Sequence, residues 1–267
     1  MSFSLPSENS WALITGASAG IGEVFAKRFA CEGWNLVLIA RSADKLQALA
    51  RTLETENRIK TLVLSEDLIN REASRKIYEE IKRKEISLDA LVNNAGFGVK
   101  GKFAEAPLHH YLEMIDLNVR TLVELTGLFL PEMIERKRGL ILNVSSTASF
   151  QPLAYSTVYA ATKAFVTFFT EALWLETQGT GVRVLNLCPG LTKTDFGLTA
   201  NMGDFRRDPL AQEPEEVVES AFRALKGNAP TVISGWLNKL IVFLERFIPR
   251  QILLWLGFLV QQSRGRV

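Results

Sequence analysis

Short apolar runs alternate along the chain with longer stretches in which apolar residues recur at helical spacing. An apolar run of four to eight residues between turn signals is typical of a buried strand. We predict such strands at residues 11–14, 36–40, 61–65, 88–92, 139–144, 182–188 and 231–235. Helices are predicted between them, at residues 20–32, 70–84, 110–136 and 156–177. Strands that alternate with helices form a parallel sheet, and ligands bind at the carboxyl ends of its strands.

The chain continues past the last predicted strand with a segment far more apolar than the surface helices before it. Six apolar residues recur there at helical spacing and form one stripe: Trp236, Leu237, Leu240, Ile241, Leu244 and Ile248. Pro249 interrupts this helix, and residues 251–260 form a second, nearly all-apolar segment. That segment is too short to span a bilayer, which takes about 20 residues. We therefore treat residues 1–235 as one domain and residues 236–267 as a helical extension that is not an independent domain.

Something must cover the apolar surface of this extension, since large apolar patches are rare on soluble monomers. Three covers stay open: the body of the same subunit, a second subunit, or a membrane interface. Basic residues outnumber the single acid, Glu245, and would suit an anionic lipid surface: Lys239, Arg246, Arg250, Arg264 and Arg266. We favour packing in an oligomer or over the subunit's own cleft, with peripheral membrane association as the alternative.

Composition and charge narrow the classes of function. The 267 residues can bury a full core. A net charge of +2, with charges interspersed, offers no electrostatic case for nucleic acid as a partner. Cys31 and Cys188 lie far apart and are predicted to be buried free thiols of a reducing compartment. The first ten residues lack a basic start and an apolar core, so we expect no secretory signal and a cytoplasmic protein.

A glycine-rich turn joins the first strand to the first helix, in the sequence Thr15-Gly-Ala-Ser-Ala-Gly-Ile-Gly22. Glycines at such a turn let the backbone approach a pyrophosphate at the N-terminus of the helix. A tight turn whose glycines serve packing alone is the alternative. The strand before the turn and the helix after it favour phosphate binding.

The end of the second strand indicates which dinucleotide would bind. It reads Ala40-Arg41-Ser42, with no carboxylate until Asp44. In NAD-binding folds an acid at this place holds the ribose 2′-hydroxyl. A guanidinium there suits a 2′-phosphate, which it can grip with two hydrogen bonds. We therefore favour NADP, with a solvated surface arginine as the alternative.

Tyr159 and Lys163 stand four residues apart in the helix predicted at residues 156–177, so their side chains share one face. A free tyrosine has a pKa of about 10, and an ammonium held close lowers that pKa. Ser146 lies upstream and could hydrogen-bond the same reacting oxygen. A half-buried tyrosine beside a surface lysine is the alternative, unless a cofactor site stands elsewhere in the chain.

Two further turns follow predicted strands and so belong to the same edge of the sheet. They are Asn93-Asn94-Ala95-Gly96 and Pro189-Gly190. His109 and His110 have no partner at ligand spacing, so we expect them to be structural and expect no metal site. The helix at residues 156–177 is apolar on several sides, so one side can face the sheet and another a partner subunit.

These motifs together resemble the short-chain dehydrogenase/reductase family over residues 10 to about 235. They occur in the family's order: Thr15-Gly16-x-x-x-Gly20-Ile21-Gly22, Asn93 to Gly96, Asn118, Ser146, Tyr159-x-x-x-Lys163 and Pro189-Gly190. The resemblance implies a Rossmann-type doubly wound parallel sheet flanked by helices, a nicotinamide cofactor and a homo-oligomer, a dimer or tetramer. It also implies the interconversion of a carbonyl and an alcohol.

The resemblance assigns catalytic roles to four residues. Tyr159 would be the acid in reduction and the base in oxidation, and Lys163 would lower its pKa and bind the nicotinamide ribose. Ser146 would hold the substrate oxygen, and Asn118 would order a water in the proton path. Ser145 is less suited, because its spacing to Tyr159 is off by one.

The resemblance also implies the contacts of the dinucleotide. They are Gly16, Ser18, Gly20, Ile21, Arg41, Asp67, Leu68, Asn93, Lys163, Pro189, Gly190, Thr192 and Thr194. Within this set, Asp67 and Leu68 would meet adenine, Asn93 would support the adenosine ribose, and Thr194 would meet the carboxamide. The sequence departs from the family at Thr192, where many members carry an aliphatic residue, and in its C-terminal extension.

The substrate is predicted to be hydrophobic. The loop at residues 195–212 offers Phe196, Leu198, Met202 and Phe205, and the opposite wall Phe97, Phe150 and Leu153. An apolar pocket suits a medium or large ketone, aldehyde or alcohol. Packing of these residues on one another is the alternative. For the whole protein, a non-catalytic dinucleotide sensor on the same fold is the other function considered, and the intact catalytic set favours an NADP(H)-dependent oxidoreductase.

Overall fold

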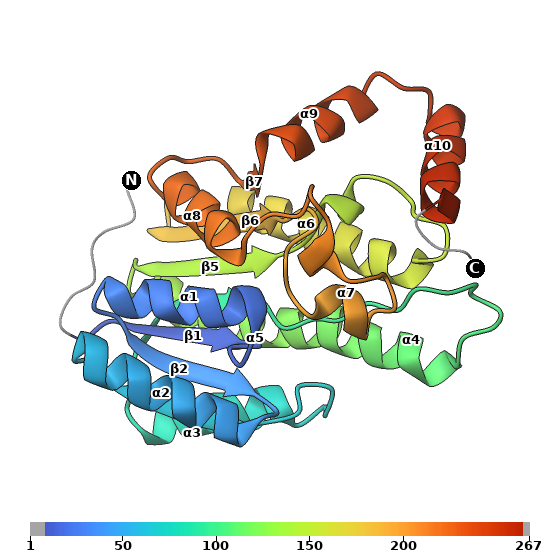
Figure 1. The fold of residues 1–267 in the computed structure, drawn as a ribbon. Coiled ribbons are helices and arrows are strands. Elements are labelled where there is room, and N and C mark those ends of the chain that lie inside the picture. Colours follow the sequence, from blue (N-terminus) through green and yellow to red (C-terminus); the bar gives the residue numbers. More distant parts are fainter. Residues whose placement is uncertain (1–8, 264–267) are drawn as a thin grey trace.

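Figure 1 shows the computed structural model of the chain, which describes residues 9–263. Its strands pair in parallel to form one seven-stranded sheet in the order β3-β2-β1-β4-β5-β6-β7. They are β1 Trp11–Thr15, β2 Asn35–Ala40, β3 Thr61–Ser65, β4 Leu88–Asn93, β5 Gly139–Val144, β6 Val182–Cys188 and β7 Thr231–Ile233. The order reverses between β1 and β4, the switch point at which doubly wound sheets bind ligands. The predicted doubly wound parallel sheet is confirmed.

Helices cover both faces of the sheet, because successive residues of a strand point to opposite sides. In β2, Leu36 and Leu38 belong to one core layer, and Val37 and Ile39 belong to the other. The first layer packs under α1 (Gly20–Cys31), α2 (Ala43–Asn57) and α8 (Pro214–Leu225). The second packs under α3 (Ala73–Arg83), α5 (Leu122–Glu135) and α6 (Thr157–Glu176).

One helical stretch runs without a break from Leu108 to Glu135, where the sequence predicts a single helix over residues 110–136. It consists of α4 (Leu108–Ile115), the π-helical turn η1 (Asp116–Thr121) and α5. The Thr121 hydroxyl donates to the Asp116 carbonyl at 3.0 Å, across the widened turn. Such turns are rare and are frequent at functional sites. This one carries Asn118.

Two sequence predictions are wrong in detail. Cys188 is buried, but Cys31 is exposed, because α1 turns Phe25 and Phe29 inward and its last residue falls outside that stripe. The helix predicted from residue 70 begins at Ala73 instead. The side-chain oxygen of Asn70 accepts the N–H of Glu72 at 3.0 Å, which closes a turn before the helix starts.

The C-terminal extension forms two helices, α9 (Trp236–Glu245) and α10 (Arg250–Ser263). Figure 1 shows that α9 rises from the end of β7 and that α10 returns beside the loop after β5. The ring of Phe258 in α10 stacks on the ring of Tyr155 in that loop, with centroids 5.9 Å apart. The second helix of the extension therefore contacts the domain. Between residues 9 and 263, no helix is long and apolar enough to cross a membrane. Arg264 and Arg266 lie outside the described residues.

Candidate active site

A cleft of about 2540 Å³ opens at the carboxyl edge of the sheet. Its lining includes the turns that follow β1, β4, β5 and β6, and it continues under α9 and α10. Pockets for a single small molecule measure about 300–1,000 Å³. The cleft therefore has room for a dinucleotide and a substrate together.

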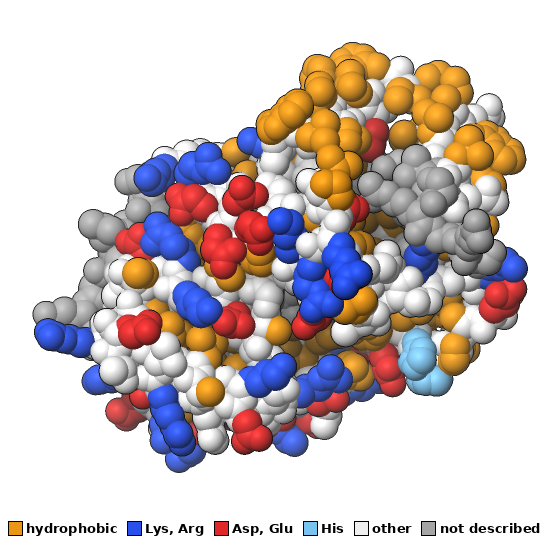
Figure 2. Space-filling model, in the orientation of Figure 1, with side chains coloured by type: hydrophobic (Ala, Val, Ile, Leu, Met, Phe, Trp, Pro, Cys, Tyr) orange, Lys and Arg blue, Asp and Glu red, His pale blue; other side chains and the backbone are white. Residues whose placement is uncertain are grey.

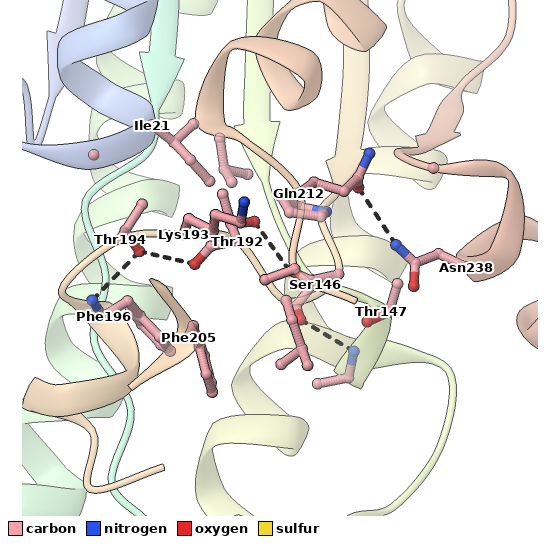
Figure 3. A pocket seen from close by; sticks show the side chains of 18 of the residues that line it. Ile21, Ser146, Thr147, Thr192, Lys193, Thr194, Phe196, Phe205, Gln212 and Asn238 are labelled. Atoms are coloured by element: carbon pink, nitrogen blue, oxygen red, sulfur yellow. Dashed lines mark hydrogen bonds between the residues drawn. The ribbon is translucent and has the colours of Figure 1, made fainter. Parts of the chain in front are cut away.

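The glycine-rich turn after β1 forms one end of the cleft. Gly16 and Gly20 adopt positive φ angles of 67° and 57°, which only glycine takes without strain. A Cβ on Gly16 would also lie 2.9 Å from the side-chain amide of Asn94. Ala19 precedes α1 without a capping side chain, so the first N–H groups of the helix are open toward the cleft. This geometry fits a pyrophosphate, and Ile21 points into the same space (Figure 3).

The end of β2 carries the residues predicted to select the 2′-phosphate. Arg41 is exposed there, and no carboxylate occupies the strand end. Lys45, which the sequence analysis did not name, lines the cleft from the first turn of α2. Asp67 and Leu68 lie off the cleft lining; the first is exposed and the second is buried. Of Arg41 and Lys45, only Lys45 is among the residues that line the cleft.

The side chain of Asn93 is committed to the core. Its amide donates to Thr126 Oγ1 at 3.1 Å and to Asn143 Oδ1 at 2.9 Å. The next residues face the cleft instead, because the Thr15 hydroxyl accepts the N–H groups of Asn94 and Ala95, both at 2.9 Å. The side chain of Asn93, which was expected to support the adenosine ribose, therefore lies off the cleft lining, whereas Asn94 lines the cleft. The sequence could not distinguish Asn93 from Asn94, because the strand was predicted to end at residue 92, just before both.

Ser146, Tyr159 and Lys163 meet in the middle of the cleft lining. Ser146 stands before the 3-10 turn η2 (Thr147–Ser149), where its hydroxyl accepts the N–H of Ala148 at 3.1 Å (Figure 3). A side-chain hydrogen bond links Ser146 to the buried hydroxyl of Tyr159. Lys163 Nζ donates to the Val144 carbonyl at 2.9 Å and lies 5.9 Å from the centroid of the Tyr159 ring.

Burial is the largest influence on the pKa values of Tyr159 and Lys163. Burial raises the pKa of Tyr159 to about 12, and the hydrogen bond from Ser146 opposes that rise. Burial also lowers the pKa of Lys163 to about 8. Lys163 was expected to lower the pKa of Tyr159, but its ammonium is directed to the Val144 carbonyl and desolvation of Tyr159 is the larger effect. At neutral pH the phenol is therefore protonated.

Asn118 lies directly behind this group rather than on the cleft surface. Its side chain accepts the N–H of Phe97 at 3.1 Å and donates to the Phe97 carbonyl at 2.9 Å and to Thr162 Oγ1 at 3.1 Å. A Cβ on Gly96 would lie 2.9 Å from Asn118 Oδ1 and 3.4 Å from Lys163 Nζ, so glycine brings these two side chains close together.

Ser145 has a different role from Ser146. Its buried hydroxyl donates to the Lys163 carbonyl at 2.8 Å and pairs with Thr167 Oγ1 at 2.8 Å. Both partners belong to α6, so Ser145 fastens that helix to the end of β5. This leaves Ser146 as the serine whose hydroxyl stands beside Tyr159.

The turn after β6 forms the other end of the cleft. Pro189, Gly190, Thr192 and Thr194 all line it, as the sequence analysis expects of nicotinamide contacts. Gln212 and Asn238 also line it but have no signal in the sequence. Gln212 Oε1 accepts from Ser234 Oγ at 2.6 Å and from Asn238 Nδ2 at 3.4 Å (Figure 3). The start of the C-terminal extension is therefore part of the site.

The predicted substrate walls are present in part. Leu153, Phe196, Met202 and Phe205 line the cleft, and the Phe196 ring centroid lies 5.6 Å from that of Tyr159. The other three predicted residues do not line it: Leu198 is exposed, Phe97 packs beside Tyr159, and Phe150 lies outside the lining. The exposure of Leu198 follows from the helix α7 (Phe196–Thr199), which turns Phe196 and Leu198 in different directions.

Fold and site together define an enzyme-like dinucleotide cleft at the switch point of a doubly wound sheet. Comparison with known families shows which one: the pattern of the short chain dehydrogenase family matches residues 10–203, so the chain belongs to that family. This confirms the resemblance.

Individual relatives agree with this assignment. Sulfoacetaldehyde reductase 2 of Chromohalobacter salexigens is 38% identical over 218 residues, which cover 79% of this chain and 86% of that protein. Human very-long-chain 3-oxoacyl-CoA reductase is 34% identical over 227 residues, or 82% of this chain and 70% of that one. A solved short-chain dehydrogenase from Sphingobium yanoikuyae in complex with NADPH has a TM-score of 0.80 and 30% identity, over 90% of this chain and 96% of that one.

Proposed function

We propose that the protein is an NADP(H)-dependent oxidoreductase that interconverts a carbonyl and an alcohol, with Tyr159 as the acid in reduction and the base in oxidation. One observation carries this proposal. Ser146, Tyr159 and Lys163 stand together in the lining of a cleft that begins at an uncapped, glycine-rich helix N-terminus.

The residues of the cleft fit NADP. Gly16, Ser18, Gly20 and Ile21 would hold the pyrophosphate at the start of α1, and Arg41 with Lys45 would meet the 2′-phosphate. Lys163, Pro189, Gly190, Thr192 and Thr194 would surround the nicotinamide riboside. When bound, the nicotinamide supplies or accepts the hydride. The Sphingobium relative with bound NADPH supports this choice of cofactor.

In the reductive direction, Tyr159 donates its proton to the substrate oxygen. Burial keeps the phenol protonated at neutral pH, because it raises the pKa of Tyr159 to about 12. The Ser146 hydroxyl donates a hydrogen bond to the same oxygen and so orients it. Lys163 stabilises the phenolate that remains after transfer, since an opposite charge nearby favours the ionised form. Asn118 holds the Phe97 backbone behind this group and would position a water in the proton path.

The lining near Tyr159 favours a medium or large hydrophobic substrate. Phe196, Met202 and Phe205 form one wall, and apolar residues of the extension form the roof: Leu237, Ile241, Val242, Leu253 and Leu256. The two relatives are named for a small charged aldehyde in one case and for a very long acyl chain in the other. The apolar roof is the feature of this chain that supports the second kind.

A homo-oligomer fits the exposed surface of the domain formed by residues 9–235. Large apolar side chains are exposed along α6, at Phe165, Phe168 and Leu175. This is the outward side of the helix that the sequence analysis assigns to a partner subunit. The extension beyond residue 235 belongs to the same unit, since α10 packs against Tyr155.

An activity screen tests the proposal. Purified protein with NADPH is assayed against steroid, aliphatic, aromatic and hydroxy-acid carbonyls, and against the corresponding alcohols with NADP⁺. We expect turnover that is greatest with bulky apolar compounds. A preference for small charged hydroxy acids would contradict the apolar site. NADPH binding without turnover across the whole panel would instead support a non-catalytic sensor.

A further inference from the structure

The helices α9 and α10 have two apolar faces. The inner face lines the cleft through residues such as Ile241 and Leu256. A second set lies off the cleft lining and is between 44% and 70% exposed: Leu240, Phe243, Phe247, Ile252, Trp255 and Leu259. We call this set the outer stripe. Its members recur at i, i+3 and i+7, first in α9 and the turn that follows it, which carries Phe247, and then within α10, so each group occupies one side of its segment.

The outer stripe is a continuous feature of the molecular surface. Figure 2 shows apolar side chains gathered over α9 and α10, whereas charged side chains of both signs are interspersed over the rest of that view. The exposed rings of Phe243 and Phe247 contact each other, with centroids 5.2 Å apart. Trp236, at the start of α9, is 76% exposed and lines the cleft as well, so it is not a member of the stripe. A patch of this extent on a folded protein marks an interaction site.

The charges beside the outer stripe have one sign. Lys239, Arg246 and Arg250 are exposed, and none of them forms an ion pair with a residue between 9 and 263. Arg246, at the C-cap of α9, is seven residues from Lys239 and therefore borders the stripe on the same flank. Lys239 also lines the cleft, and so does Glu245, the single acid of the extension. The Oε2 atom of Glu245 is buried there without a hydrogen-bond partner among the described residues.

A second copy of this chain is a poor occupant for such a surface. A two-fold contact through the stripes would bring the cations of both copies, Lys239, Arg246 and Arg250, to one interface, where the outer stripe supplies no acid. The apolar side of α6, at Phe168 and Leu175, offers a separate surface for a second subunit. Cations beside exposed tryptophan, phenylalanine and leucine are instead the composition of helices that lie in a membrane interface.

We propose that the outer stripe docks on an anionic lipid surface, with its apolar side chains at the boundary of headgroups and acyl chains and its cations among the headgroups. The inner face of the same helices remains the roof of the cleft. Neither helix needs to enter the bilayer further, in agreement with the absence of any membrane-spanning helix in the described part of the chain. The proposal does not depend on the reaction, because the six apolar side chains of the outer stripe lie off the cleft lining.

Vesicle flotation of the full-length protein at physiological salt is the test. Vesicles of phosphatidylcholine with phosphatidylglycerol are compared with vesicles of phosphatidylcholine alone, and bound protein is measured in the floating fraction. We expect wild-type protein to float with the anionic vesicles. The triple variant Phe243→Ser, Phe247→Ser, Trp255→Ser should bind about tenfold more weakly or worse, since it removes three apolar anchors. Lys239→Glu with Arg246→Glu should reduce binding to the level seen on neutral vesicles.

A matched control separates lipid binding from a general loss of apolar surface. Leu108→Ser with Leu112→Ser removes two exposed apolar side chains from α4, rather than from the α6 surface proposed for a second subunit, and should float as the wild type does. Circular dichroism and a melting curve establish that each variant is folded. Wild-type protein that stays with the unbound fraction on anionic vesicles would overturn the proposal. A stripe variant that dissociates an oligomer, measured by light scattering without vesicles, would overturn it in favour of a second subunit.

Discussion

Asn238, in the first turn of α9, packs directly on Gly190, in the turn that follows β6. A Cβ on Gly190 would overlap the side-chain amide of Asn238, so only glycine permits this approach. The amide is held in place by a hydrogen bond from Nδ2 to the Ser234 carbonyl at 2.8 Å and a weaker one to Gln212 Oε1 at 3.4 Å. The start of α9 is therefore in direct contact with the turn proposed to bind the nicotinamide.

This contact leads to a prediction about Gly190→Ala. The added methyl must displace Asn238 and with it the start of α9, and overpacking of this kind destabilises a protein by about 1–3 kcal/mol. We expect a lower free energy of unfolding in denaturant and weaker NADPH binding. Asn238→Ala alone should lower the free energy of unfolding by about 1 kcal/mol, because it removes the hydrogen bond to Ser234.

The double variant provides the control. Asn238→Ala deletes the atoms that a Cβ on Gly190 would meet, so Gly190→Ala should cost much less in that background. A double-mutant cycle in denaturant measures this coupling. Additive effects of the two substitutions would show that the Asn238 side chain does not contact residue 190 in solution.

The second prediction concerns the proposed catalytic acid. Tyr159→Phe keeps the ring in its contact with Phe196 and removes only the hydroxyl that would donate the proton. Since general acid–base catalysis contributes about 10²–10⁴-fold, we expect kcat to fall by at least that order while the Kd of NADPH changes little. Steady-state kinetics and a fluorescence titration with NADPH measure the two quantities.

Tyr111→Phe is the matched control. Tyr111 is a buried tyrosine of the same apolar cluster, but its ring stacks on Phe103 and it lies off the cleft lining. This variant should retain activity close to that of the wild type. Normal turnover by Tyr159→Phe would refute the assignment of the acid.

The third prediction concerns the choice between NADPH and NADH. Arg41→Asp removes a cation at the end of β2 and places a carboxylate where NAD-binding folds hold the ribose hydroxyls. We expect the ratio of kcat/KM for NADPH over NADH to fall by one to two orders of magnitude, at about 1.5–3 kcal/mol for a charge-assisted hydrogen bond. Lys45 should retain part of the preference, because it lines the cleft nearby.

Arg51→Asp makes the same change of charge at an exposed position further along α2, away from the end of β2, and should leave the ratio unchanged. Two results would contradict the prediction. One is an Arg41→Asp variant with the wild-type ratio; the other is a wild type that binds NADH more tightly than NADPH.

The sequence was sufficient to predict the sheet, because its central strands, such as β2, β4 and β6, are short apolar runs buried on both faces. It was also sufficient to place Ser146, Tyr159 and the glycine turn on one edge, since parallel strands bring their carboxyl ends together. These are consequences of local pattern and topology.

What the sequence could not show depends on where single side chains point. Asn93 and Asn94 are neighbours, yet one is buried in the core and the other faces the cleft. Gln212 and Asn238 meet only because the chain folds back over the turn after β6, and nothing in their spacing indicates this. The position of the Lys163 ammonium depends likewise on the Val144 carbonyl, which local sequence does not reveal.

The last prediction concerns Lys163 and the pH dependence of stability. Burial lowers the pKa of Lys163 to about 8 in the folded protein, from about 10.4 in an unfolded chain. Between these values the unfolded state binds more protons than the folded state, so the free energy of unfolding rises with pH. Below pH 8 the lysine is charged in both states, and the full penalty of burying the ammonium is present. That penalty corresponds to roughly 3 kcal/mol at 1.36 kcal/mol per pKa unit.

Lys163→Met should therefore flatten the pH dependence between pH 8 and pH 10. Denaturant unfolding of wild type and variant at several pH values measures the difference between their free energies of unfolding. The change of this difference with pH tests the prediction. Its absolute size does not, because the variant also loses the hydrogen bond to Val144. Measurements stop at pH 10, because burial raises the pKa of Tyr159 to about 12 and that group lowers stability as pH rises above 10. Lys226→Met, at an exposed position of α8's C-terminal cap, should keep the wild-type slope. Parallel curves for wild type and Lys163→Met would mean that the ammonium is solvated in the folded protein, and the proposed stabilisation of the Tyr159 phenolate by Lys163 would then have to act across water.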